Sequence, residues 1–132
     1  MSGELYPTAT RGLTSLRREL VPDAAAAFND FGKVVFADGA LPTKMKHVVA
    51  VAVAHVTQCP YCIHGHTRAA LREGASQQEL MEAIWVAAEM RAGAAFAHSI
   101  IAIAEMEEAG SDAANGHPQH TPATGEHHGH SI

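Results

Sequence analysis

The chain has 132 residues and a mass of 13.9 kDa, which is enough for one domain with a single hydrophobic core. Its net charge is −5 and it has no cluster of Lys or Arg, which argues against nucleic acid or an acidic membrane surface as a partner. Hydrophobic residues make up 47% of the chain and aromatic residues only 5%, so small aliphatic side chains must fill the core. Such a composition favours closely packed helices.

The N-terminal segment MSGELYPTATRGL lacks the charged and then apolar pattern of a signal peptide. The longest uninterrupted apolar run, Val48 to Ala54, is far shorter than the roughly 20 residues that span a bilayer. We therefore expect a cytoplasmic protein with no membrane partner, in a compartment where structural disulfides are rare.

The sequence begins with a short arm that is expected to be irregular, and signals for the start and end of helices follow it. A helix is predicted over residues 22–38, because proline is favoured in the first turn of a helix. Residues 44–57 contain the run VVAVAVA, which is apolar on all sides and typical of a buried helix. A further helix begins at Pro60, with Cys59 at the N-cap position, and stops at Gly74.

The second half of the chain predicts two more helices. The sequence SQQE, residues 76–79, is a capping box that begins the first of them. Trp85 is expected to anchor the core beside a solvated face of glutamates. Gly93 marks a break or a bend, and a last helix follows over residues 94–108.

Strands are scarce, so the pattern predicts a compact all-α domain over residues 1–110, with about five to six helices. Residues 111–132 have no periodicity and almost no large apolar side chain, which predicts a disordered tail. Histidine-rich tracts of this kind can hold transition metals. The histidines of the tail are His117, His120, His127, His128 and His130.

The segment HVTQCPYCIHGH, residues 55–66, contains both cysteines and three of the ten histidines. On a helix, Cys59, Cys62 and His66 share one face, because each residue is turned by about 100° from the one before. His66 follows Cys62 by one helical turn, within reach of the thiol proton directly or through one water. A helix N-terminus also stabilises a thiolate, the reactive form of cysteine. Together these features indicate redox chemistry.

The segment from Leu41 to His98 resembles the core of the carboxymuconolactone decarboxylase superfamily, in its alkylhydroperoxidase D-like branch. The resemblance rests on C-P-Y-C-x-x-x-H, on the A-x-x-x-G-A-S that follows it, and on the E-A of the next helix. It implies a homo-oligomer, often a trimer or hexamer, whose dithiol reduces hydroperoxides or the disulfide of a partner protein. A dithiol donor would then restore the thiols. No phosphate-binding motif such as G-x-G-x-x-G is present, so we expect no organic cofactor.

In that branch a glutamate, twelve positions before the first cysteine, joins the histidine in a proton relay to the second cysteine. Here that position is His47, and a neutral imidazole can orient His66 without adding negative charge, so we predict weaker thiol activation. Tyr61 also departs from the pattern, since alkylhydroperoxidase D has a histidine there. The resemblance implies that Cys62 attacks and Cys59 resolves, whereas the N-cap position favours Cys59 as the attacking thiol. Both assignments stay open.

Two other functions fit the same residues. Cys59, Cys62, His66 and His47 would together form a Cys₂His₂ set, a normal complement of ligands for zinc. A decarboxylase-like or non-catalytic helical assembly would function without either cysteine. His55 lies on nearly the same helical face as His47, and it could line the same pocket or be a core histidine.

Overall fold

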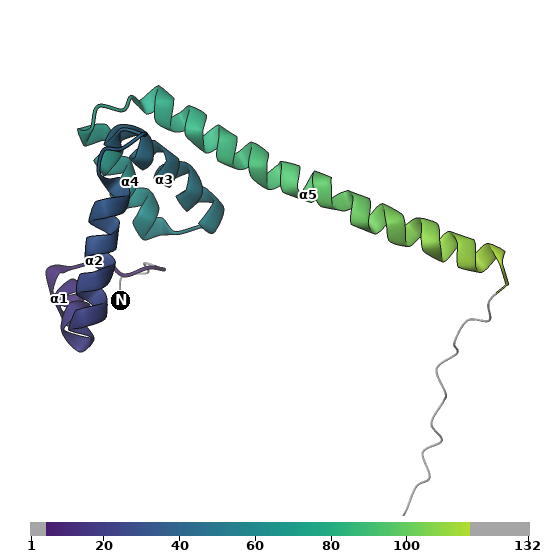
Figure 1. The fold of residues 1–132 in the computed structure, drawn as a ribbon, viewed down its shortest axis with the longest axis horizontal. Helices are drawn as coiled ribbons and strands as arrows, with labels where there is room; N and C mark the ends of the chain where they lie inside the picture. The colour runs from purple at the N-terminus through teal and green to yellow at the C-terminus, as the bar shows by residue number, and fades with distance from the viewer. Residues whose placement is uncertain (1–4, 117–132) are drawn as a thin grey trace, which may run out of the picture. The chain divides into compact units, whose positions relative to one another are not determined.

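The computed structural model describes residues 5–116, which contain five α-helices and no strand (Figure 1). The helices are α1 Arg11–Leu20, α2 Pro22–Phe36, α3 Thr43–Thr57, α4 Pro60–Arg72 and α5 Gln77–Ala114. The predicted all-α fold is confirmed. The chain divides into two compact units between Gly93 and Ala94, and the site described below lies in the first. A single domain over residues 1–110 stays a prediction.

Two predicted features of the helices are wrong. Helix α1 replaces the irregular arm, because the Thr10 side chain caps it by accepting a hydrogen bond from the Leu13 amide. Helix α5 is unbroken at Gly93, since a glycine inside a helix costs only about 1 kcal/mol relative to alanine. It continues to Ala114, so the first residues of the predicted tail are helical. The rest of that tail, 117–132, lies outside the described residues.

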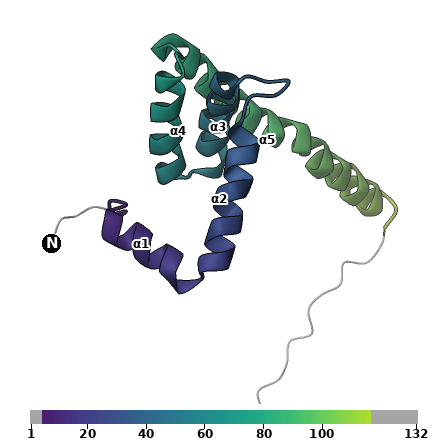
Figure 2. The ribbon, with the colours of Figure 1, turned by 60° about the vertical axis from the view of Figure 1, so that its left-hand side comes forward.

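The hydrophobic core lies where α3, α4 and the beginning of α5 meet. Val51 of α3 and Ala70 of α4 are fully buried and pack with Ala75 and Leu80. Figures 1 and 2 both show α3 and α4 side by side, and small side chains such as Ala70 permit that close approach. The prediction of a core built from small aliphatic residues is confirmed for this unit.

The capping box at the start of α5 forms as predicted. The Ser76 amide donates to Glu79 Oε2 at 2.7 Å, and the Glu79 amide donates to Ser76 Oγ at 3.0 Å. Glu79 Oε1 also accepts a hydrogen bond from Lys44 Nζ of α3, at 3.0 Å. The Ser76 amide and, to a smaller extent, Lys44 lower the pKa of Glu79. These contacts hold the first turn of α5 against α3.

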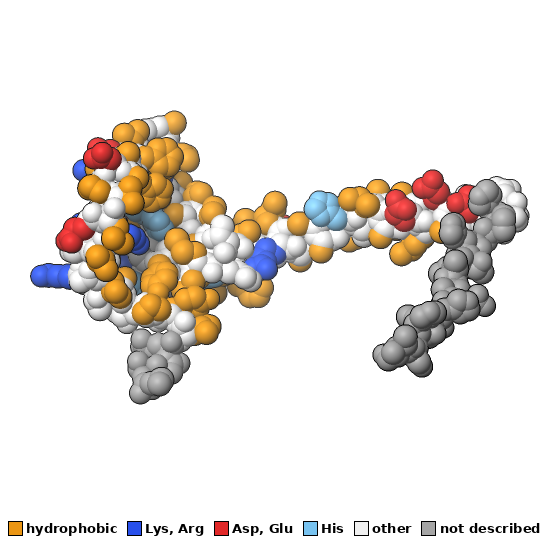
Figure 3. Space-filling model, turned by 90° about the horizontal axis from the view of Figure 1, so that it is seen from below, with side chains coloured by type: hydrophobic (Ala, Val, Ile, Leu, Met, Phe, Trp, Pro, Cys, Tyr) orange, Lys and Arg blue, Asp and Glu red, His pale blue; other side chains and the backbone are white. Residues whose placement is uncertain are grey.

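Much of the apolar surface is exposed within the single chain. Phe28, Trp85 and Phe96 are 76%, 70% and 82% exposed, and Figure 3 shows hydrophobic side chains over much of the visible face. Trp85 therefore does not anchor the core of the isolated chain, and that prediction is wrong. Within residues 5–116, α5 is long and apolar enough to cross a membrane by length and composition alone, a test that the core helix of a soluble protein also passes.

Candidate functional site

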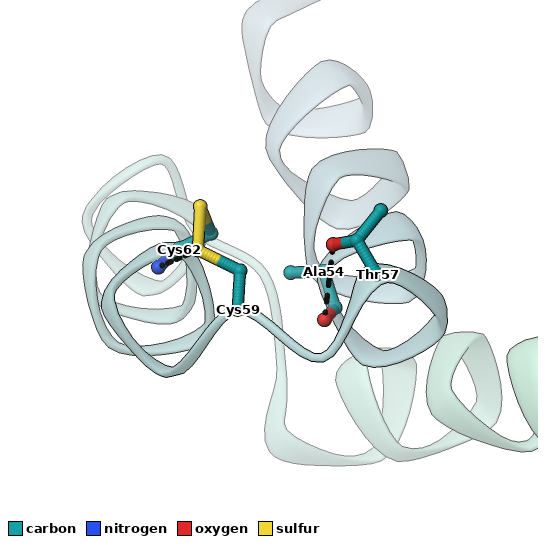
Figure 4. Close-up of a disulfide and its surroundings, with 4 residues drawn as sticks. All are labelled: Ala54, Thr57, Cys59 and Cys62. Atoms are coloured by element: carbon teal, nitrogen blue, oxygen red, sulfur yellow. Dashed lines mark hydrogen bonds between the residues drawn. A yellow bond between two sulfur atoms is a disulfide. The ribbon is translucent and has the colours of Figure 1, made fainter. Parts of the chain in front are cut away.

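A tight turn between α3 and α4 positions the first cysteine. Gln58 ends α3 in the left-handed conformation, with φ at 57°, and the Cys59 amide donates to Ala54 O at 3.1 Å. Cys59 is then the N-cap of α4, as predicted, and its Sγ accepts a hydrogen bond from the Cys62 amide at 3.2 Å (Figure 4). The turn thus places both sulfur atoms at the N-terminus of α4.

Cys59 and Cys62 form a disulfide, with their Cα atoms 5.3 Å apart (Figure 4). Both residues are half-buried, so the pair remains accessible from solvent. The first amides of α4 lie beside the sulfur atoms, at the positive end of the helix dipole. After reduction, this position would stabilise a thiolate.

The structure brings the two predicted relay histidines together across two helices. His47 of α3 and His66 of α4 approach with their Nδ1 atoms 3.1 Å apart. Such a contact needs one Nδ1–H as donor and one Nδ1 lone pair as acceptor. The pair can therefore be neutral or carry a single extra proton. It loses the hydrogen bond when both rings are protonated.

Phe36, the last residue of α2, stacks on both imidazoles. Its ring centroid lies 4.6 Å from that of His47 and 4.9 Å from that of His66, with interplanar angles of 10° and 24°. Sequence reasoning missed this residue. Its only signal is an aromatic side chain near the end of a predicted helix, which does not show that it meets two histidines from other helices.

The connection between α2 and α3 fixes Phe36 relative to His47. Asp38 Oδ1 accepts a hydrogen bond from the Thr43 amide at 2.8 Å, and the Thr43 hydroxyl lies 2.8 Å from Phe36 O. The bond from the Thr43 amide is the main cause that lowers the pKa of Asp38. The carboxylate thus caps the first turn of α3, the helix that carries His47.

Burial lowers the pKa of His47, and the positive charge of a protonated His66 lowers it further. Glu73 opposes this change through its negative charge, but it is a smaller influence. His47 is therefore neutral at neutral pH and can act as the acceptor in the histidine pair. In that arrangement His66 carries Nδ1–H, and its Nε2 has no proton. Cys62 precedes His66 by one turn of α4.

The remaining predicted residues have other contacts. The Tyr61 hydroxyl donates to Pro7 O at 2.8 Å, and its ring packs edge-on against Tyr6, so it holds the N-terminal arm. His55 is half-buried and hydrogen-bonds through Nδ1 to Val51 O of its own helix, at 2.7 Å. Among residues 5–116, no group of three or more His, Cys, Asp or Glu side chains is arranged to hold a metal ion. The Cys₂His₂ alternative thus has no support from this arrangement.

Comparison with known proteins identifies the class. The pattern of the carboxymuconolactone decarboxylase family matches residues 22–105, more than half of the chain, and the chain belongs to that family. It is 56% identical over 101 residues to an uncharacterised protein of the cox locus in Paracoccus denitrificans, covering 76% of this chain and 88% of that protein.

Two solved structures of the family have a similar fold. One comes from Legionella pneumophila, with a TM-score of 0.56 and 31% identity over 58% of this chain and 69% of that one. The other comes from Thermotoga maritima, with a TM-score of 0.50 and 27% identity over 70% of this chain and 96% of that one. An involvement in the antioxidative response has been suggested for the Thermotoga protein.

Proposed function

We propose that the protein is a thiol oxidoreductase that reduces hydroperoxides, or the disulfide of a partner protein, through Cys59 and Cys62. The observation that carries the proposal is the 3.1 Å contact between His47 and His66. It leaves His66 Nε2 available as a base on the same helix as Cys62, one turn away. The family, and the antioxidative role suggested for its Thermotoga member, support the same direction.

The first step removes the thiol proton of Cys62. His66 Nε2 accepts it while Nδ1–H donates to His47 Nδ1, so the new positive charge is stabilised by a neutral acceptor. The thiolate sulfur then attacks the terminal oxygen of the hydroperoxide. An S–O bond forms, the O–O bond breaks, and the alcohol leaves with a proton from His66.

The second step closes the disulfide. Cys59 Sγ attacks the sulfenic acid on Cys62, an S–S bond forms, and the oxygen leaves as water. The hydroperoxide is thereby reduced by two electrons to an alcohol and water, and two thiols are oxidised to the Cys59–Cys62 disulfide. A dithiol donor returns both thiols by disulfide exchange. We place this cycle in the cytoplasm, where such donors keep thiols reduced.

The test counts thiols in the fully reduced protein before and after a stoichiometric amount of cumene hydroperoxide. We expect two thiols to be lost per chain, with formation of the internal disulfide detected by mass spectrometry. In a Cys62→Ser variant, whose remaining thiol cannot close the ring, no internal disulfide should form. Two surviving thiols in the reduced wild-type protein would refute the peroxidase proposal.

We also propose that the working form is a homo-oligomer. Only six hydrophobic residues are buried among residues 5–116, namely Val51, Ala54, Ala70, Ala75, Leu80 and Ala87. Large apolar side chains left exposed in one chain are typical of surfaces that pack against a second copy. Sedimentation velocity at micromolar concentration should give a mass of two or more times 13.9 kDa, with a trimer or hexamer expected. A monomer under those conditions would contradict this proposal.

A further inference from the structure

An open groove of about 1050 Å³ lies between α1 and α2 and reaches His47. On the α2 side its lining residues are Pro22, Ala24, Ala25, Ala26, Phe28, Asn29, Gly32, Lys33 and Phe36. They span the whole of α2, about 20 Å at 1.5 Å per residue. The volume lies just above the usual range for small-molecule sites, about 300–1,000 Å³, and far exceeds what hydrogen peroxide fills.

Cationic side chains line this α1–α2 groove. Arg17 and Arg18 of α1 and Lys33 of α2 contribute to it, and none of its lining residues within the described part of the chain is an Asp or Glu. Lys33 pairs with Asp30 at 3.3 Å, which leaves the two guanidinium groups as the main anion partners. A cationic groove on a chain of net charge −5 indicates an anionic ligand, and guanidinium groups match a carboxylate.

The inner end of the groove is part of the histidine site. Phe36 lines the groove and stacks on both His47 and His66, and His47 itself lines the groove. A ligand lying along α2 therefore ends against Phe36 and His47, and both of these rings contact His66. Between the arginines and this end, the lining includes apolar side chains such as Val21, Ala25 and Phe28.

We propose that the α1–α2 groove binds a long-chain fatty-acid hydroperoxide, with its carboxylate at Arg17 and Arg18 and its apolar chain along α2. This inference rests on the proposed function and specifies its substrate class. The hydroperoxide group lies at the His47 end of the groove, and its reduction to an alcohol and water by the dithiol converts Cys59 and Cys62 to the disulfide. Charge selects the acid over its esters, and the length of the groove selects a long chain over a short one.

Binding is tested on the oxidised full chain, by calorimetric titration with decanoate and, as the uncharged comparison, 1-decanol. We expect the double variant R17Q/R18Q to bind decanoate about tenfold more weakly and decanol unchanged. R11Q, on the same helix but outside the groove, should behave as wild type. Absence of decanoate binding, or equal loss for both ligands, would overturn the inference.

Gly32→Leu tests the groove without removing a charge. A Cβ at Gly32 meets no atom within 4 Å, so the leucine extends into open groove space and also improves helix propensity. It should block decanoate binding, while Gly12→Leu, equally unobstructed but outside the groove, should not. Unchanged binding in Gly32→Leu would contradict the proposed position of the chain.

Thiol oxidation separates this inference from the proposed function. The reduced full chain should be oxidised about tenfold faster by linoleic acid hydroperoxide than by its methyl ester, and R17Q/R18Q should abolish the difference. Equal rates for acid and ester would overturn the substrate class and leave the peroxidase proposal standing. No thiol loss with any hydroperoxide would overturn the peroxidase proposal, and with it this substrate class, even if decanoate binds.

Discussion

The acceptor at position 47 sets how readily His66 takes the proton of Cys62. In the wild-type protein that acceptor is Nδ1 of the neutral His47 imidazole, which lies 3.1 Å from His66 Nδ1. His47→Glu replaces it with a carboxylate, which accepts from the imidazolium formed when the thiol is deprotonated. The wild-type bond already has a charged donor, so the carboxylate adds the attraction of an ion pair, about 0.2–1 kcal/mol when the pair is exposed and more when it is partly buried. Because the site is half-buried and partly screened, we use a difference of about 1 kcal/mol.

A difference of about 1 kcal/mol corresponds to about a fivefold change in rate. We therefore expect His47→Glu to be oxidised by cumene hydroperoxide about fivefold faster than wild type at pH 7, and His47→Leu, which offers no acceptor, about fivefold slower. His47→Gln keeps a neutral acceptor and should remain close to wild type. The assay follows thiol loss by stopped flow in fully reduced protein, with circular dichroism as the check that each variant is folded.

The matched control is His55→Leu, since His55 lies on the same helix but hydrogen-bonds to its own backbone. It should not change the rate. If His47→Leu reacts as fast as wild type, or if His47→Glu is no faster than His47→Gln, position 47 takes no part in the proton transfer. The thiol would then be activated by the N-terminus of α4 alone.

Three further predictions concern stability. Phe36→Leu loses two aromatic stacking contacts of about 0.5–1.5 kcal/mol each. Urea denaturation should therefore show a free energy of unfolding that is lower by about 1–2 kcal/mol. Phe28→Leu, at an exposed position, should lower it by less than about 0.5 kcal/mol. Ser76→Ala removes the N-cap of α5 and should lower the free energy of unfolding by about 1 kcal/mol. The comparison is Ser99→Ala, since the Ser99 hydroxyl donates to Phe96 O of the same helix. An equal loss of stability in the two variants would contradict the prediction. Because the folded-state pKa of His47 lies below its ordinary value of 6.5, the unfolded chain binds more protons, and the free energy of unfolding should fall as the pH drops through about 6.5. His47→Gln should reduce that fall, and an unchanged profile would exclude His47 as its source.

Local signals predicted much of the fold. The proline at the start of α2, the N-cap at Cys59 and the capping box at Ser76 each depend on residues within one helical turn, and each forms as expected. The failures have local causes too. Thr10 is a good N-cap, but Gly12 in the first turn lowers the helix propensity of this segment, so its helical signal is weak. At Gly93 a helix-breaking residue was outweighed by strong helix formers on both sides.

The site was only partly predictable. The spacing of Cys59, Cys62 and His66 on one helix follows from helical geometry, whereas the meeting of His66 with His47 was expected only from the family resemblance. The position of Phe36 could not be foreseen, because it depends on how the α2–α3 connection folds back through the contacts of Thr43. Contacts between helices are set by packing, which a pattern along one segment does not encode.

Trp85 was expected to anchor a core, and we predict that it does so in the oligomer and not in the single chain. It is the only tryptophan of the protein, so intrinsic fluorescence reports on this one position. Its ring is 70% exposed in the isolated chain, and burying an aromatic side chain against a second copy would stabilise an interface strongly. We expect blue-shifted emission that is shielded from iodide at high protein concentration, and a red shift with increasing quenching on dilution. Red-shifted, quenchable emission in a sample that sediments as an oligomer would show that Trp85 lies outside the interface, and the exposed apolar surface elsewhere would have to account for association.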